Sequence, residues 1–276
     1  MHPLLVPAYG VAIAIEILLP LALALWLQRR YRVSWKVFGY GALVFLVFQV
    51  LTRVPAIQAL QGRIQGRLES SPWNMVAWIA FAALTAGLFE EGGRYLGYRV
   101  LWKKGEERTW GQALMYGAGH GGLESMLLVG GMAVLSLISI INLMQGNTSG
   151  IPLTPDELAK ISQARAEIAA LPWWLPLIGA LERILTMVIQ VSLSVLVLQV
   201  FRRQRFWWWW LALGYHTLAD LVVSLVAYGV SGRLPDSVAY LLVEASVLLF
   251  ALLGVGIILW LRPKQEPTEA LVKTEG

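Results

Sequence analysis

The chain contains no cysteine, and only 14% of its 276 residues are Asp, Glu, Lys or Arg. The absence of cysteine excludes disulfide bonds and thiolate-ligated metal sites. The charged fraction is far below the roughly one quarter that soluble domains carry. Histidine is also scarce, with three residues in all. What is abundant is apolar: 57% of the residues are hydrophobic, which is typical of a membrane protein.

Long apolar runs recur along the whole sequence. Each predicts a membrane-spanning helix, because about 20 residues at 1.5 Å rise cross a hydrocarbon core of about 30 Å. The runs are continuously apolar rather than alternating, which favours helices over a β-barrel. The predicted fold is therefore an all-α polytopic bundle of seven spans, at about 4–27, 36–53, 73–102, 109–144, 173–201, 206–230 and 235–261.

Lysine and arginine gather after alternate spans. Basic residues next to spans stay on the cytoplasmic side, so this pattern places the N-terminus outside and the C-terminus in the cytoplasm. These clusters account for the net charge of +5, and no nucleic-acid partner is expected. The clusters are Arg29, Arg30, Arg32 and Lys36, then Lys103, Lys104 and Arg108, then Arg202, Arg203 and Arg205, and finally Arg262 and Lys264.

Residues 1–262 are expected to form a single transmembrane domain, because the spans leave no room for a soluble one. The first span lacks the basic residues that precede the apolar core of a cleaved signal peptide, so we expect it to be retained. Residues 263–276 are polar and are predicted to be a disordered cytoplasmic tail. The expected location is the prokaryotic plasma membrane, with the lipid bilayer as a partner, and the oligomeric state is left open.

Two connections on the predicted outer side are long. The stretch from Arg53 to Ser71 is expected to lie along the membrane interface. Residues 154–170 are predicted to form an amphipathic helix on the outer surface. Thr154 is a suitable N-cap for this helix, and Glu157 completes a capping box three residues later.

Ionisable residues inside spans are costly and mark function by default. Residues four apart share a helix face. His120 and Glu124 therefore present two potential ligands in one direction, as do His216 and Asp220, and Glu90 can pair with Arg94. The whole set is Glu16, Glu90, Glu91, Arg94, His120, Glu124, Glu182, Arg183, His216, Asp220 and Glu244.

Depth in the membrane groups three of these residues. Counted from the predicted cytoplasmic edge, Glu91, His120 and His216 lie roughly 16–20 Å deep at 1.5 Å per residue. We therefore expect three helices to deliver these side chains to one level, slightly past the mid-plane. Glu244 lies nearer the outer face, in a second layer, where an ion pair with Arg183 is expected because buried charges need partners.

Two imidazoles and a carboxylate at one point are the ligands of a divalent metal site, most typically zinc. His120, Glu124 and His216 are the candidate metal ligands. A catalytic metal also needs a base for its water, and Glu90 and Glu91 offer one orienting group and one base. Which glutamate takes which part is left open.

The order of these residues resembles three known motifs. Glu90 to Arg94, Tyr116 to His120 and His216 to Asp220 look like the motifs of the CAAX-prenyl-protease-type and bacteriocin-processing membrane proteases. They are more closely similar to the YhfC family of intramembrane metalloproteases. The arginine comes one residue earlier than in the CAAX-protease form, closer to the spacing of PrsW-like proteases, which carry lysine there. Glu124 is additional to the CAAX-protease motif.

The resemblance implies hydrolysis of a peptide bond of a membrane-associated substrate. Glu90 and Glu91, with Arg94 and Asp220, would serve catalysis, and the histidines would bind metal or the oxyanion. The predicted cut lies near the cytoplasmic half of the bilayer. Two other functions stay open: a proton- or cation-coupled transporter, since buried His and carboxylates also relay protons, and a non-catalytic membrane chaperone or immunity partner on the same fold.

Overall fold

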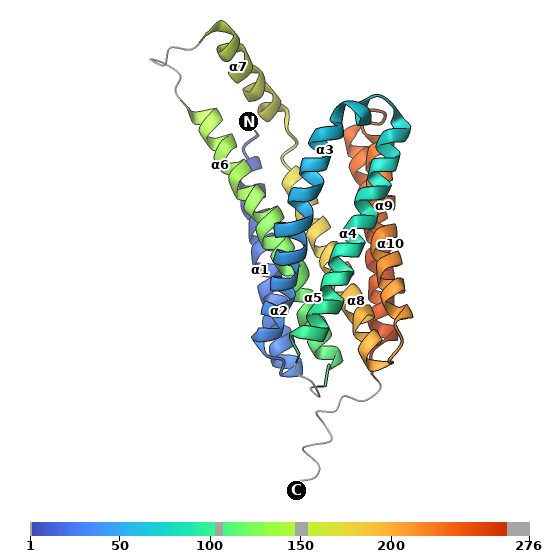
Figure 1. Ribbon diagram of the computed structural model, residues 1–276. Coiled ribbons are helices and arrows are strands. Elements are labelled where there is room, and N and C mark those ends of the chain that lie inside the picture. Colours follow the sequence, from blue (N-terminus) through green and yellow to red (C-terminus); the bar gives the residue numbers. More distant parts are fainter. Residues whose placement is uncertain (1, 103–106, 147–153, 264–276) are drawn as a thin grey trace.

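The computed structural model describes residues 2–102, 107–146 and 154–263 (Figure 1). All regular structure in these ranges is helical. The predicted disordered tail, apart from Pro263, lies outside the described residues, as do Lys103 and Lys104. The elements are α1 Leu5–Tyr31, α2 Trp35–Phe45, the π-helix η1 Leu46–Arg53, α3 Val54–Glu69, α4 Pro72–Val100, α5 Trp110–Leu123, the π-helix η2 Glu124–Gly130, α6 Gly131–Gln145, α7 Pro155–Ala170, α8 Leu175–Arg202, α9 Trp207–Val230 and α10 Asp236–Trp260.

The described ranges contain seven continuous helices that are long and apolar enough to cross a membrane, which confirms the predicted count. One of them is longer than predicted: helices α2, η1 and α3 run on as one helix of 35 residues, where the sequence predicts a span at 36–53. Helices α5, η2 and α6 form one helix of 36 residues, which agrees with the span predicted at 109–144. The ends of the other five spans lie within four residues of the predicted ones.

The prediction that residues 53–71 lie along the interface as a separate segment is wrong. Residues Val54–Glu69 form α3, which continues the helix and packs beside α4. Pro55 would normally interrupt a helix because it lacks an N–H group. The turn before it is already widened, since the Val54 N–H donates to the Gln49 carbonyl five residues back. The helix therefore passes the proline instead of ending there.

The amphipathic helix is confirmed as α7, with reciprocal bonds between Thr154 and Glu157 that form the predicted capping box. None of its residues is buried. Arg165 on α7 donates to the carbonyl oxygens of Leu143 and Gly146 at 2.9 and 2.6 Å, where α6 ends. These bonds use acceptors that a helix end leaves unpaired. The position of α7 on the outer membrane surface stays a prediction.

Helix α8 forms the centre of the bundle. It packs against α1, α5, α9 and α10, and every residue from Ile189 to Val200 is buried. Four polar residues, Gln190, Ser192, Ser194 and Gln199, lie in this buried stretch. A helix that is covered on all sides can hold polar side chains in fixed positions, because each must find a partner inside the protein.

The bundle has two chemically different ends (Figure 1). At one end, which we call the basic end, α1 and α8 finish and α2 and α9 begin, beside the clusters around Arg30 and Arg203. At the other end, which we call the α3–α4 end, α3 turns into α4 and α9 turns into α10. The positive-inside rule assigns the basic end to the cytoplasm, and that orientation stays a prediction.

Glycine lets α2 and α5 touch through their backbones. A Cβ atom on Gly119 would lie 2.0 Å from the Phe38 carbonyl oxygen, and one on Gly41 would lie 2.0 Å from the Tyr116 carbonyl oxygen. This is the close approach that small residues permit between membrane helices. It seats Tyr116 and His120, which lie on the same helix, firmly against the bundle.

Replacing Gly119 with alanine should destabilise the bundle, because the new methyl group would overlap backbone that cannot move aside. Overpacking of this kind costs about 1–3 kcal/mol. The thermal unfolding midpoint of the purified protein in detergent measures the effect. Gly92→Ala is the matched control, since nothing lies within 4 Å of its added Cβ atom. Equal midpoints for the two variants would contradict this packing.

Candidate active site

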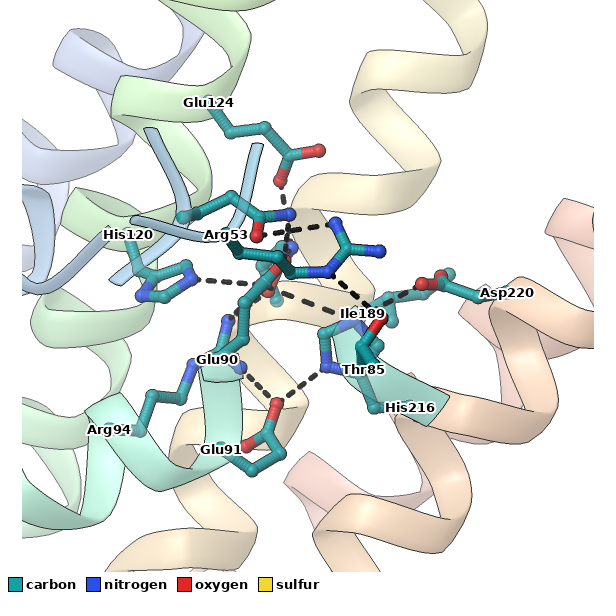
Figure 2. A network of polar contacts seen from close by, with 12 residues as sticks. Arg53, Thr85, Glu90, Glu91, Arg94, His120, Glu124, Ile189, His216 and Asp220 are labelled. Atoms are coloured by element: carbon teal, nitrogen blue, oxygen red, sulfur yellow. Dashed lines mark hydrogen bonds and ion pairs between the residues drawn. The ribbon is translucent and has the colours of Figure 1, made fainter. Parts of the chain in front are cut away.

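Helix α4 carries the two glutamates into the middle of the bundle. Its start is fixed by the Ser71 N-cap and by Pro72 in the first turn, which suit a helix N-terminus. Glu90, Glu91 and Arg94 lie about 18 to 22 residues after Pro72 on the same helix, and all three are buried. Figure 2 shows them converging with His120 from α5 and His216 from α9. The structure joins Glu91 to His216 and His120 to Glu90, so the three residues predicted to converge lie in one buried network.

Glu90 is held by neutral donors on three other helices. Its Oε2 lies 3.0 Å from His120 Nε2 and 3.4 Å from Gln190 Nε2, and its Oε1 accepts from Gln49 Nε2 at 3.0 Å. The Arg94 guanidinium is 3.6 Å from the same Oε2. These contacts fix the position of the carboxylate.

Glu91 contacts a different histidine. Its Oε1 lies 2.7 Å from His216 Nδ1 and also accepts from Arg94 Nη1. Its Oε2 and the Arg94 Nε have no hydrogen-bond partner among the described residues. The second Arg94 nitrogen, Nη2, donates to Gln190 Oε1. One guanidinium therefore lies between two adjacent carboxylates and offsets their mutual repulsion.

His216 is oriented by Glu91 so that its other nitrogen faces away from that carboxylate. His216 Nε2 lies 4.0 Å from Glu90 Oε2 and 3.6 Å from Asp220 Oδ2. A carboxylate on one ring nitrogen sets the tautomer and direction of the imidazole. Glu90 and the predicted partner Asp220 are therefore both near His216 Nε2, at distances too long for a direct hydrogen bond.

One intervening residue separates Glu124 from this group. The spacing predicts that it shares a direction with His120, but the chain becomes π-helical at Glu124, and its oxygens face α8. Glu124 Oε2 accepts from Gln190 Nε2 at 2.7 Å, and its Oε1 accepts from Arg183 Nη1 at 3.1 Å. Gln190 therefore bridges Glu124 and Glu90, and no direct contact joins Glu124 to His120.

In the second layer, Arg183 pairs with carboxylates other than the expected Glu244. It pairs with Glu124 and with its neighbour Glu182. The expected ion pair with Glu244 is wrong, because the Arg183 guanidinium pairs with Glu124 and Glu182 instead. Within the described residues, Glu244 Oε2 has no hydrogen-bond partner.

Sequence reasoning missed three residues of the site: Gln49, Arg53 and Gln190. The two amides carry no charge, so a search for ionisable residues passes over them, although polar side chains inside spans are themselves a signal. Arg53 was placed in a connection. Because η1 continues the helix, Arg53 instead donates to Gln49 Oε1 at 3.3 Å and to the Ala82 carbonyl oxygen at 2.6 Å.

A cavity of about 360 Å³ adjoins this network. Its lining includes Glu90 and His216, but neither Glu91 nor Arg94. Asp220 also lines it, and the Asp220 side chain is 42% exposed, compared with 6% for His216. The cavity therefore reaches Glu90 and His216, whereas Glu91 stays buried outside its lining.

The donor types suit a divalent metal, but their arrangement does not form a site for one. Among the described residues, no three His, Asp or Glu side chains are grouped so that they could hold a metal ion. His120 and Glu90 are joined to each other, and the guanidinium of Arg94 beside both glutamates supplies the positive charge. His120 Nδ1 is buried without a partner, so the usual second contact of a metal-ligating histidine is missing.

Removing the buried cation should cost far more than removing an exposed one on the same helix. Arg94→Met leaves two buried carboxylates uncompensated, a loss of about 3–5 kcal/mol. Arg99→Met, at an exposed position, should change the stability by less than about 0.5 kcal/mol. Thermal unfolding in detergent compares the two. Similar midpoints would show that Arg94 does not hold the site together.

Comparisons with known proteins agree on one family. The model of the family described as YhfC intramembrane metalloprotease matches residues 15–242. The "Uncharacterized membrane protein YhfC" of Bacillus subtilis (strain 168) is 30% identical over 218 residues, which cover 79% of this chain and 83% of that protein. No solved structure matches. With seven apolar helices and these matches, the chain is a multi-pass membrane protein and belongs to the YhfC intramembrane metalloprotease family.

Proposed function

We propose that the protein is an intramembrane peptidase in which Glu90 activates water for attack on a peptide bond of a membrane-associated substrate. The observation that supports this most is the placement of Glu90. It is a buried carboxylate in contact with His120 from another helix, and it lines a polar cavity. A base must reach the proton that it removes, and Glu90 is the glutamate with such access.

The two glutamates take different parts in this proposal. Glu91 lies outside the cavity lining, and one of its oxygens is occupied by both Arg94 and His216. It is therefore a positioning residue that sets the direction of the His216 ring. Glu90 is the base, and its neutral amide and imidazole contacts hold the carboxylate still without removing its charge.

The gap between Glu90 and His216 is suited to a water molecule. The 4.0 Å between Glu90 Oε2 and His216 Nε2 is too long for a direct hydrogen bond, and one water can contact both atoms. As this water attacks the scissile carbonyl carbon, its proton passes to Glu90. The C–N bond then breaks, and Glu90 returns the proton to the leaving amine.

His216 and Asp220 act on the oxygen that gains negative charge. Nε2 of His216 faces the cavity and can donate to the carbonyl oxygen of the substrate when its ring is protonated. Asp220, 3.6 Å from this nitrogen, favours that protonated form. His120 donates to the carboxylate of Glu90 and so holds the base in position. Arg94 stabilises the carboxylates of both Glu90 and Glu91.

The family description implies a metal, and zinc is the ion that imidazole and carboxylate ligands favour. The sequence predicts one divalent ion, zinc first, with His120, Glu124 and His216 as ligands, and binding it would require the His120 and Glu124 side chains to leave the contacts that they make in this structure. Protein purified without chelators should contain about one such ion per chain, measured by elemental analysis. His120→Ala and His216→Ala should lose it, whereas Glu182→Gln should retain it. Equal content in all variants, including none, would contradict the metal.

Glu90→Gln should abolish cleavage, because an amide cannot accept the proton of water. Loss of a general base costs at least about 10²-fold in rate. New protein N-termini in membranes that express the chain, identified by terminal-amine proteomics, measure the activity. The same variant should retain bound substrate in a pull-down. Glu167→Gln, at an exposed position on α7, is the matched control and should cleave normally.

Unchanged new N-termini in the Glu90→Gln membranes would contradict the peptidase. Solute flux in sealed vesicles that follows a pH or ion gradient, and that Glu90→Gln abolishes, would support the transporter instead. A partner protein bound equally well by wild type and Glu90→Gln, with no new N-termini in either, would support the chaperone or immunity protein.

A further inference from the structure

The polar cavity extends from the site in one direction only. On α4 it is lined by Trp78, Ile79, Ala82, Ala83, Ala86 and Glu90. Ile79 precedes Glu90 by eleven residues, which corresponds to a path of roughly 16 Å at 1.5 Å rise per residue. Ile79 lies seven residues after Pro72, where α4 begins. The cavity therefore leads from Glu90 towards the α3–α4 end of the bundle.

Exposure increases along two helices in the same direction. On α9 it rises from the His216 side chain, 6% exposed, to that of Asp220, 42% exposed, and then to the exposed Ser224. On α8 it rises from the buried Gln190 to the Glu182 side chain, which is 37% exposed. Because α8 and α9 run in opposite directions, both gradients point to the α3–α4 end. Figure 2 places Asp220, Arg53 and Glu124 around this side of Glu90.

The side towards the basic end is sealed. Beyond Arg94, the rings of Tyr98 and Tyr116 are fully buried, with centroids 4.6 Å apart. Tyr98 donates to the Ser194 carbonyl oxygen on α8 at 3.1 Å, which joins the aromatic pair to the central helix. Trp208, on α9, is buried at the same end. Beyond Glu90 on α4 and the buried Leu193 on α8, no described residue towards this end lines the cavity.

The cavity walls suit a chain that has lost its helical hydrogen bonds. Unwound backbone at membrane depth is tolerated only where it lines a water-filled or polar space. Here the guanidinium and carboxylate groups of Arg53, Arg183, Glu182 and Asp220 provide that space, together with the small side chains of the alanines on α4. A peptide bond must be unwound before water can attack it, so an extended peptide is the form this cavity favours.

We propose that the substrate is a polar, extended peptide segment that enters from the α3–α4 end, which the positive-inside rule places on the outer face of the membrane. The site is then a pocket that opens outwards, and segments on the cytoplasmic side do not reach it. This inference rests on the proposed function for its substrate, but the direction of access stands on the cavity alone.

The absence of native cysteine makes access directly measurable. Single cysteines are placed at Ser224 in the cavity, at Ser231 in the turn after α9, at Gln204 in the turn before α9, and at Ser194 on the sealed side. Each variant is treated with a membrane-impermeant methanethiosulfonate in right-side-out and in inside-out vesicles. Labelling is quantified by the mass of the intact protein.

We expect Ser224→Cys and Ser231→Cys to react in right-side-out vesicles, and Gln204→Cys in inside-out vesicles, with a preference of at least about tenfold in each case because thiol reactivity follows exposure. Ser194→Cys should react in neither. Ala82→Cys, in the cavity wall of α4, should follow Ser224→Cys. Reaction of Ser224→Cys from the Gln204 side, or from neither side, would overturn the access route.

The outcome is separable from that of the cleavage test. If Glu90→Gln still cleaves while the labelling follows the expected pattern, the peptidase proposal fails and the outward-facing cavity stands. If Glu90→Gln abolishes cleavage while Ser224→Cys is labelled only from the Gln204 side, the peptidase stands and the outward access is overturned.

Discussion

Two adjacent carboxylates in the interior of a membrane helix are the constraint on which the rest of this structure depends. Glu90 and Glu91 point in different directions on α4, so one helix alone cannot satisfy both. Arg94 lies between them, and each then binds a histidine from a different helix. Helices α4, α5, α8 and α9 are thereby fixed at one level, and α8 contributes Gln190 to complete the network.

The same constraint separates the two glutamates chemically. Glu91 is buried with Arg94 and His216, and it fixes the direction of the His216 ring. Glu90 remains at the wall of the cavity, where a substrate and water can reach it. The sealed aromatic layer around Tyr98 and Tyr116 on one side and the polar walls on the other give the site a direction. In the proposed peptidase, this asymmetry would keep the attacking water confined to one pocket.

The sequence predicts the spans and the convergence because both follow from simple periodicities. Hydropathy fixes the seven helices, and depth counting alone places Glu91 level with His216. The sequence does not predict the two π-helical turns, because no residue type specifies them. These turns carry Gln49 and Arg53 into the site and turn Glu124 towards Arg183 instead of His120. The side chains of Gln49 and Gln190 are not predicted either, because a search for charged residues does not find neutral amides.

The central claim is that each glutamate is paired with its own histidine. Double-mutant cycles on thermal stability in detergent test it most directly, with Glu→Gln and His→Ala changes at the four positions. The account predicts coupling of at least about 1 kcal/mol for Glu90 with His120 and for Glu91 with His216, and coupling near zero for the crossed pair Glu91 with His120. Strong coupling in the crossed pair, or none in the two direct pairs, would contradict it.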